Sequence, residues 1–343
     1  MQPIFSQLLD ELQTWMVQNG EKPFRAQQVF EWLYDKSAAS FEAMTSLNLA
    51  LRAKLNVAFQ FSLLTQSRLS RSEDGETEKF LWELADGKKV ESVLIFSGQR
   101  RTLCISCQVG CPARCAFCAS GKQGLLRNLS CAEIVEQLQQ ANRYLQQKGE
   151  KVTHVVFMGM GEPMENYEAV VKAIRLFCNS DAFRISQRRI TVSTVGVVEG
   201  ILRLAREELK VNLVLSLHAP NQLLRKKIIP YARRYLLEEI LTAMDQYAAL
   251  TKRDITYEYT LLAGINDGLE HAEELADLLR GKQCTVNLIP YNPVDGLKLR
   301  RPEKGQIEAF RSLLEEKGIN ATWRYTKGKD IAAACGQLAL YSG

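Results

Sequence analysis

The chain has 343 residues, 46% of them hydrophobic and 24% charged, and a net charge of +5. This balance fits a globular enzyme with one large domain and a small appendage. No run of about 18 apolar residues is present, and the N-terminal sixteen residues contain two acids and no basic leader. We therefore expect a cytoplasmic protein with no membrane partner, in which nine cysteines do not form a disulfide framework.

The chain divides into three stretches of different character. Residues 1–58 have apolar side chains at helical spacing and predict a small helical domain, with Ser46 capping its third helix. Residues 59–99 change to short alternating runs separated by turn-like segments, which predict a β-ribbon extension. From residue 100 to 343, β-rich runs alternate with helical segments, which predicts βαβ units and a parallel sheet. The helices expected there are Cys131–Leu145, Glu168–Phe177, Leu236–Ala249, Ala272–Leu279 and Lys304–Glu316.

Periodicity leaves open whether this sheet closes into a barrel, half-closes, or stays open and doubly wound. In each case, functional residues should gather at the carboxyl ends of the strands. Polar and glycine-rich segments do follow the predicted strands: GMGEPMEN, STVG, SLHAPN, LLAGIND and PYNPVDG.

Five of the nine cysteines fall between residues 104 and 118, and such crowding indicates metal or redox chemistry. Three thiolates on one compact loop can hold three irons of a cubane and leave the fourth iron open to a chelating ligand. A zinc site is the alternative, with Cys107 or Cys104 as the fourth ligand. The aromatic Phe117 and the spacing C-x3-C-x2-C favour the cluster. That spacing is formed by Cys111, Cys115 and Cys118.

The spacing resembles the signature of radical S-adenosylmethionine (SAM) enzymes, and the surrounding segments resemble the RlmN/Cfr family of RNA adenosine methyltransferases. These segments run in order from about residue 88 to 340, and FRAQQVFEWLY extends the match into the N-terminal domain. They are TLCISCQVGCPARCAFCASGKQGLLRNLS, FMGMGEPMEN, STVG, SLHAPN, VNLIPYNP and DIAAACGQL. The resemblance implies an α/β fold with a partial (β/α)6-type radical SAM barrel. It assigns RNA binding to 1–58 and catalysis to 100–343.

The resemblance also implies the cofactors and partners. One 4Fe-4S cluster would be held by Cys111, Cys115 and Cys118, and SAM would bind its open iron, with two SAM used per turnover. The substrate would be an adenosine in 23S ribosomal RNA, transfer RNA or both. An electron donor such as flavodoxin or ferredoxin would serve the cluster, and we expect a monomer.

Three further residues take chemical roles from the resemblance. Cys335 would carry the methyl group, Cys104 would resolve the covalent intermediate through a transient disulfide with it, and Glu91 would accept a proton. From the residues alone, each cysteine resembles a small buried hydrophobe and Glu91 a solvent-facing strand carboxylate. Cys107 stands where the family commonly has serine, which leaves its role open. The remaining cysteines are expected in the core: Cys131, Cys178 and Cys284.

SAM contacts are expected at the ends of several strands. Glycines in GMGEP let the backbone approach a ligand, and the glutamate after them can accept from the SAM ammonium. For His218, a structural role is an equal alternative to a contact with SAM. Asn292 would either hold the adenosine part of SAM or position Cys335. The residues assigned to SAM are Gly161, Glu162, Ser193, Ser216, Leu217, His218 and Asn292.

Basic clusters flank several of these loops, as phosphate contacts would, although a charge run is usually a solvated face. They are Arg100-Arg101, Lys122 with Arg127, Arg188-Arg189, Arg225-Lys226-Lys227, Arg233-Arg234 and Arg300-Arg301. Within the family, methylation at carbon 2 is favoured by GMGEP and FRAQQVFEWLY, and carbon 8 is the alternative. Two other readings are a non-enzymatic metal-containing RNA-binding protein and a radical SAM enzyme acting on a small molecule or peptide.

Overall fold

A computed structural model describes residues 1–323 and 326–338. Its centre is a ten-stranded sheet with the order β14-β13-β12-β11-β10-β9-β6-β5-β4-β3, so the sheet keeps two edges and does not close. Seven neighbouring strands are parallel, which confirms the predicted βαβ architecture. They are β6 (Arg100–Cys104), β9 (His154–Phe157), β10 (Ile190–Thr194), β11 (Asn212–Ser216), β12 (Ile255–Leu261), β13 (Cys284–Pro290) and β14 (Asn320–Trp323).

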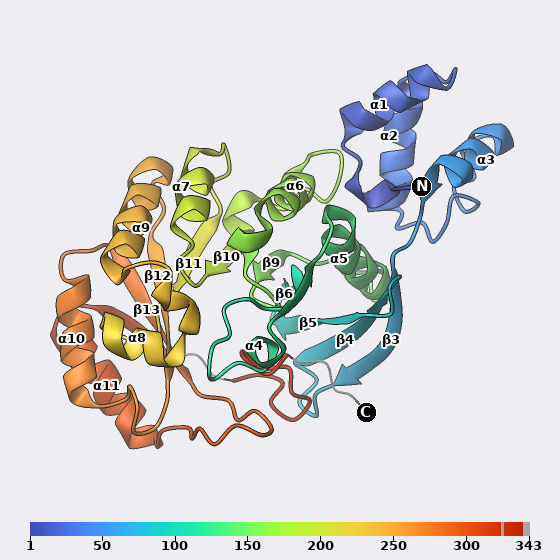
Figure 1. The fold of residues 1–343 in the computed structure, drawn as a ribbon. Coiled ribbons are helices and arrows are strands. Elements are labelled where there is room, and N and C mark those ends of the chain that lie inside the picture. Colours follow the sequence, from blue (N-terminus) through green and yellow to red (C-terminus); the bar gives the residue numbers. More distant parts are fainter. Residues whose placement is uncertain (324–325, 339–343) are drawn as a thin grey trace.

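Helices connect these strands and cover one face of the curved sheet (Figure 1). The five helices predicted from periodicity are confirmed within three residues at each end. Ser130 starts α5 because its hydroxyl accepts from the Glu133 amide while the Glu133 carboxylate accepts from the Ser130 amide. The five are α5 (Cys131–Gln146), α6 (Tyr167–Cys178), α9 (Leu237–Thr251), α10 (Leu269–Leu279) and α11 (Lys304–Glu316), and α7 (Val198–Arg206) is an additional helix that was not predicted.

The N-terminal helices form a separate module at one end of the molecule (Figure 1). They are α1 (Leu9–Gln18), α2 (Phe24–Phe30) and α3 (Leu49–Ala58). The predicted cap of the third helix is wrong. Asn48 caps it by accepting from the Leu51 amide over 2.7 Å, whereas the Ser46 hydroxyl accepts from the Trp32 indole over 2.7 Å. Tyr34 links the module to the main domain through an edge contact with Phe183.

The expected β extension is three antiparallel strands: β3 (Leu64–Arg71), β4 (Thr77–Leu84) and β5 (Lys89–Ser97). They do not form a free ribbon, because β5 pairs antiparallel with β6 and so continues the main sheet. This places residues of β4 and β5 next to the first strand of the parallel region.

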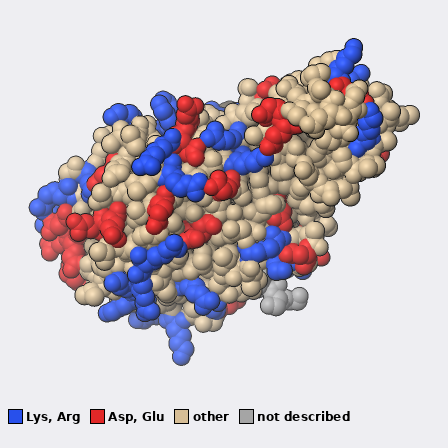
Figure 2. Space-filling model, turned by 45° about the horizontal axis from the view of Figure 1, so that its top comes forward, with Lys and Arg blue, Asp and Glu red and all other residues tan. Residues whose placement is uncertain are grey.

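One large apolar core runs through the main domain and into the N-terminal module. None of the described helices is both long and apolar enough to span a membrane. On the face shown in Figure 2, basic and acidic side chains are interspersed over the surface.

Candidate active site

The cysteine loop leads from β7 (Gln108–Gly110) to the short helix α4 (Ala119–Gln123). Its turns are closed by backbone hydrogen bonds, from the Cys118 amide to the Cys115 carbonyl and from the Cys111 amide to the Gly124 carbonyl, each 3.1 Å. Gly110 is required here, because a Cβ atom would lie 1.9 Å from the Gly124 oxygen. The loop thereby brings three sulfurs to the wall of one cavity of about 130 Å³.

The electrostatics of this loop fit a bound cluster. Burial raises the pKa of the Cys115 and Cys118 thiols, so without a metal they hold their protons, and a bound metal would replace those protons. Arg225 is fully buried near Cys115, and its Nη1 has no hydrogen-bond partner within the part of the chain that the structure describes. Burial lowers the pKa of Arg225 to about 10, so it remains a cation at neutral pH. A buried cation with an unpaired N–H suits an anionic thiolate-bound cluster.

The described residues contain no group of three His, Cys, Asp or Glu side chains that converges on a single metal ion. The three cysteines line one cavity together, where each thiolate would bind a different iron of a cubane. Cys111, Cys115 and Cys118 would therefore hold the cluster, which when bound supplies the electron for cleaving SAM.

The position of Arg225 corrects one expectation from the sequence. It was grouped with surface phosphate contacts, but its guanidinium donates to the carbonyls of Val195 over 2.6 Å and Ser216 over 3.1 Å. Arg225 is therefore a buried residue near Cys115 and not a surface phosphate contact. A helical amphipathic pattern in QLLRKKI could have indicated this, because Arg225 and Ile228 lie on the same buried face of α8 (Gln222–Ile228).

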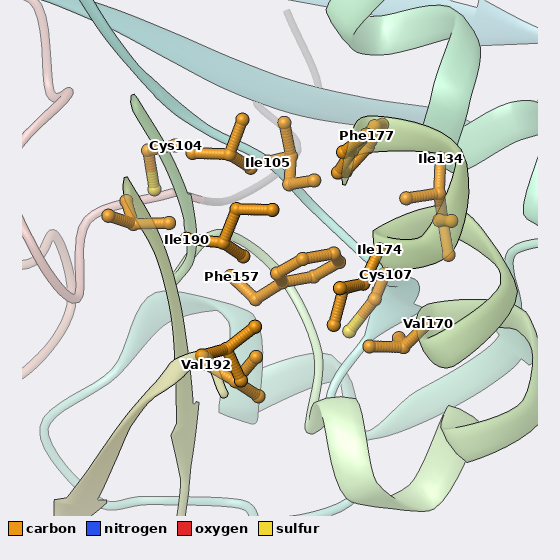
Figure 3. Close-up of a cluster of buried hydrophobic side chains, with 14 of the residues drawn as sticks. Cys104, Ile105, Cys107, Ile134, Phe157, Val170, Ile174, Phe177, Ile190 and Val192 are labelled. Atoms are coloured by element: carbon orange, nitrogen blue, oxygen red, sulfur yellow. The ribbon is translucent and has the colours of Figure 1, made fainter. Parts of the chain in front are cut away.

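The glycine-rich turn after β9 forms a second wall of the cavity. Gly161 has φ of 113°, and a Cβ atom there would lie 2.8 Å from the Cys107 sulfur. Cys107 is buried in the core, and Figure 3 shows it among Ile174 and Val170 of α6. Glu162 accepts from the amides of Met164 over 3.0 Å and Val195 over 2.8 Å. Burial raises the pKa of Glu162 to about 7.

The ends of β10 and β11 supply polar groups to the same cavity. The Ser193 and Ser216 hydroxyls lie 3.1 Å apart and both line it. His218 also lines it, and its Nδ1 accepts from the Thr260 amide over 2.9 Å, which leaves the proton on Nε2. Burial lowers the pKa of His218 to about 3, so the ring is neutral. Both roles weighed for this histidine are thus compatible. Leu217 points into the core and does not line the cavity.

Cys335 lies in a C-terminal segment, residues 326–338, which we call the carrier segment. Asn292 holds it in place by donating to the Cys335 carbonyl over 3.1 Å and accepting from the Thr326 hydroxyl over 3.0 Å. The Ala119 amide of the cysteine loop donates to the Gly336 carbonyl over 2.8 Å. The carrier segment is therefore fastened directly to the loop that bears Cys118.

A second cavity of about 590 Å³ adjoins the first, because Met158, Glu258 and Ile289 line both. Cys335 lines both cavities, whereas Cys104 lines only the second. Figure 3 shows Cys104 at the margin of the apolar cluster, away from the α6 side chains. Strand register puts Cys104 opposite Val93 of β5, and Glu91 lies two residues away on the same face. Glu91 is buried, contrary to its reading as a solvent-facing carboxylate.

Sequence reasoning missed Lys79, whose ammonium lies 2.9 Å from a Glu91 carboxylate oxygen. Lys79 belongs to no sequence motif, and its contact with Glu91 is set by the register in which β4 and β5 pair. Several expected RNA contacts are paired with acids instead: Arg101 with Glu150, and Arg127 with Asp86 and Glu133. Such pairing leaves these arginines less available to phosphate.

Known protein families match this chain over most of its length. The radical SAM superfamily matches residues 105–279, and the ribosomal RNA large subunit methyltransferase N-terminal domain matches residues 5–60. A protein of Protochlamydia amoebophila named probable dual-specificity RNA methyltransferase RlmN 2 is 63% identical over 96% of this chain and 92% of its own length. The chain belongs to the RlmN-type radical SAM methyltransferases.

Other relatives agree with this family. A Bacillus subtilis protein named probable dual-specificity RNA methyltransferase RlmN is 44% identical over 98% of this chain and 92% of its own length. The crystal structure of a radical SAM methyltransferase from Sphaerobacter thermophilus superimposes with a TM-score of 0.96 at 44% identity, covering 98% of this chain and 99% of that one. The resemblance, the fold and the enzyme class expected from the sequence are confirmed, and the family uses an iron–sulfur cluster and SAM.

Proposed function

We propose that this enzyme methylates carbon 2 of an adenosine in 23S ribosomal RNA, transfer RNA or both, through a methylated Cys335. The observation that carries the proposal is the position of Cys335 on the wall shared by two cavities. One cavity contains the cluster cysteines and the SAM loops, and the other contains Cys104. A carrier must visit both a methyl donor and an acceptor, and this position serves both.

Each residue then has a chemical task. Cys335 accepts a methyl group and then loses a hydrogen atom from it; SAM, when bound, would supply the methyl group and, from a second molecule, the radical that takes the hydrogen atom. The methylene carbon bonds to the adenine ring carbon, and Glu91 accepts the ring proton; a cluster held by Cys111, Cys115 and Cys118 would take up the electron that the adduct releases. Cys104 then attacks the Cys335 sulfur, the electron pair of the sulfur–carbon bond stays on carbon, and protonation completes the methyl group.

RNA recognition rests on the family's N-terminal domain and on basic side chains near the cavities. The relatives' names specify RNA methyltransferases of dual specificity, which supports both ribosomal and transfer RNA as substrates. A target base must leave its stack to reach the Cys335 thiol on the wall of the cavities, so loops suit better than paired stems. We place the enzyme in the cytoplasm as a monomer that receives electrons from flavodoxin or ferredoxin.

The test is mass spectrometry of RNA digests after anaerobic reaction with methyl-labelled SAM. We expect labelled 2-methyladenosine from the native enzyme and none from Cys335→Ala, with iron content unchanged. Cys178→Ala, a matched change on the outer helix α6, should retain activity. Labelled 8-methyladenosine would support the carbon 8 alternative. Methylation of RNA by Cys335→Ala would overturn the carrier mechanism.

A further inference from the structure

A buried lysine joins the proposed base to the carrier segment. The Lys79 ammonium lies 2.9 Å from a carboxylate oxygen of Glu91 and donates to the Ala332 carbonyl over 3.1 Å. The side chains of Lys79 and Glu91 are only 8% and 3% exposed. Burying a cation is costly unless charged and polar partners surround it, so this arrangement fixes all three groups relative to one another.

Strand register explains why these groups meet. In the β4–β5 pair, Leu81 lies opposite Glu91 and Lys79 lies opposite Val93, so Lys79 and Glu91 are diagonal neighbours on one face. In the β5–β6 pair, Val93 lies opposite Cys104. One row of the sheet therefore runs from Lys79 through Val93 to Cys104, the proposed resolving thiol.

Lys79 contacts the carrier segment at Ala332, whose backbone conformation is strained. Ala332 has φ of 50°, a left-handed conformation that costs a non-glycine residue about 1 kcal/mol. Such a conformation persists only when surrounding contacts hold it. Lys79 is one such contact, and Cys335 follows three residues later.

We propose that Lys79 is a positioning residue that keeps Glu91 ionised and holds the carrier segment at a fixed place relative to it. The inference rests on the proposed function, in which Glu91 accepts the ring proton. A carboxyl group this deeply buried would favour its neutral form without a cation, and a neutral carboxyl accepts no proton. During the step the proton moves from carbon to the Glu91 oxygen, the bonding electron pair stays in the ring, and Lys79 keeps its own protons.

Other charged and titratable groups also lie on this face. Lys89 of β5 and Glu83 of β4 are opposite each other on the same face as Glu91, near the turn that joins the two strands. The Lys89 ammonium lies 3.9 Å from a Glu83 carboxylate oxygen, and both side chains are more exposed than that of Glu91. Cys104 on β6 and Cys335 on the carrier segment add two thiols. A pH profile must therefore be compared between variants that differ only at Lys79.

A second lysine provides a matched control. Lys327 also fastens the carrier segment, by donating to the Phe96 carbonyl over 3.0 Å and pairing with Glu76 over 3.0 Å. Its ammonium pairs with Glu76, whereas that of Lys79 pairs with Glu91. Lys327→Met thus loosens the same segment by removing a cation that pairs with a different acid.

The experiment uses the full chain, reconstituted anaerobically, with SAM and an RNA substrate. In Lys79→Met we expect iron content and Cys335 methylation to stay within about twofold of native, while resolution of the RNA–protein adduct slows at least about tenfold at pH 7. The half-maximal pH of resolution should move upward, and Lys79→Arg should restore most of the rate. Lys327→Met should leave that half-maximal pH unchanged.

The outcomes separate two failures. If Glu91→Gln resolves the adduct at the native rate, Glu91 is not the base and the proposed mechanism fails at that step. If Glu91→Gln stalls while Lys79→Met resolves at the native rate and pH, the inference about Lys79 alone is wrong. Should Lys79→Met not fold, Lys79→Gln answers the same question, because its amide can donate to Ala332 without carrying charge. A native pH profile in Lys79→Gln would overturn the inference.

Discussion

The Asn292 side chain donates to the carbonyl of Cys335, with 3.1 Å between nitrogen and oxygen. The contact favours the positioning role among the two that the sequence leaves open for this asparagine, because it orients the carrier residue directly. Asn292 also lines both cavities, so a ligand bound in either cavity can contact its side chain.

We expect Asn292→Leu to slow methylation of Cys335 about tenfold, because one net hydrogen bond contributes about 1 kcal/mol or more to the carrier position. Iron content should not change. Labelled methyl incorporation into the protein, followed by peptide mass spectrometry, measures the rate. Asn320→Leu, at an exposed strand position paired with Thr285, is the control and should react at the native rate.

Replacing any cluster cysteine should remove iron. Anaerobically prepared native protein should be brown with about four irons per chain, and Cys115→Ala should be colourless and unable to cleave SAM. Cys284→Ala, at the start of β13, should keep its colour. A stoichiometric zinc ion in active native protein would contradict this assignment.

Gly161→Ala should disrupt the SAM loop. Besides the cost of φ at 113°, a methyl group there would meet the Gln108 Cβ at 2.7 Å and the Cys107 sulfur at 2.8 Å. Gly149→Ala has φ of 68° but open space around its Cβ, so it isolates the backbone cost. We expect Gly161→Ala to lose about 1–3 kcal/mol more unfolding free energy than Gly149→Ala, and to bind SAM more weakly. Equal losses would show that the close packing is unimportant.

Glu162 should make the stability of the cluster-free protein depend on pH. Burial raises its pKa from an ordinary 4.5 to about 7 in the folded state. Between these values the folded protein holds more protons than the unfolded chain, so stability falls as pH rises from 4.5 to 7 and then levels off. Glu162→Gln should remove up to about 3 kcal/mol of that decline, measured by denaturant unfolding. Identical pH curves for both proteins would contradict the prediction.

Local signals predicted the elements, and the cysteine spacing predicted the cluster loop, because both depend on residues close in sequence. Such signals do not predict which side chains of neighbouring strands contact each other. Lys79 and Glu91 are diagonal partners only through the β4–β5 register. Helix α7 is not among the helices predicted from periodicity; its Gly200 is needed because a Cβ there would meet the Met164 side chain at 2.7 Å.

The last prediction concerns Cys104, which shares the second cavity with Cys335. In Cys104→Ala the first methyl transfer, radical formation and attack on RNA should all proceed, because none of these steps uses a second thiol. The adduct should then persist. The protein should co-purify with RNA, and nuclease treatment should leave a nucleotide on the peptide that contains Cys335.

Cys131→Ala is the matched control, because Cys131 is a similarly buried thiol that starts α5 and lines neither cavity. If Cys104 were only a core residue, both variants would lose a similar amount of unfolding free energy and neither would retain RNA. Retained RNA in Cys104→Ala alone would therefore reflect chemistry at the thiol. Free RNA with native turnover in Cys104→Ala would exclude Cys104 as the resolving residue, while the role of Cys335 would be tested separately by its own substitution.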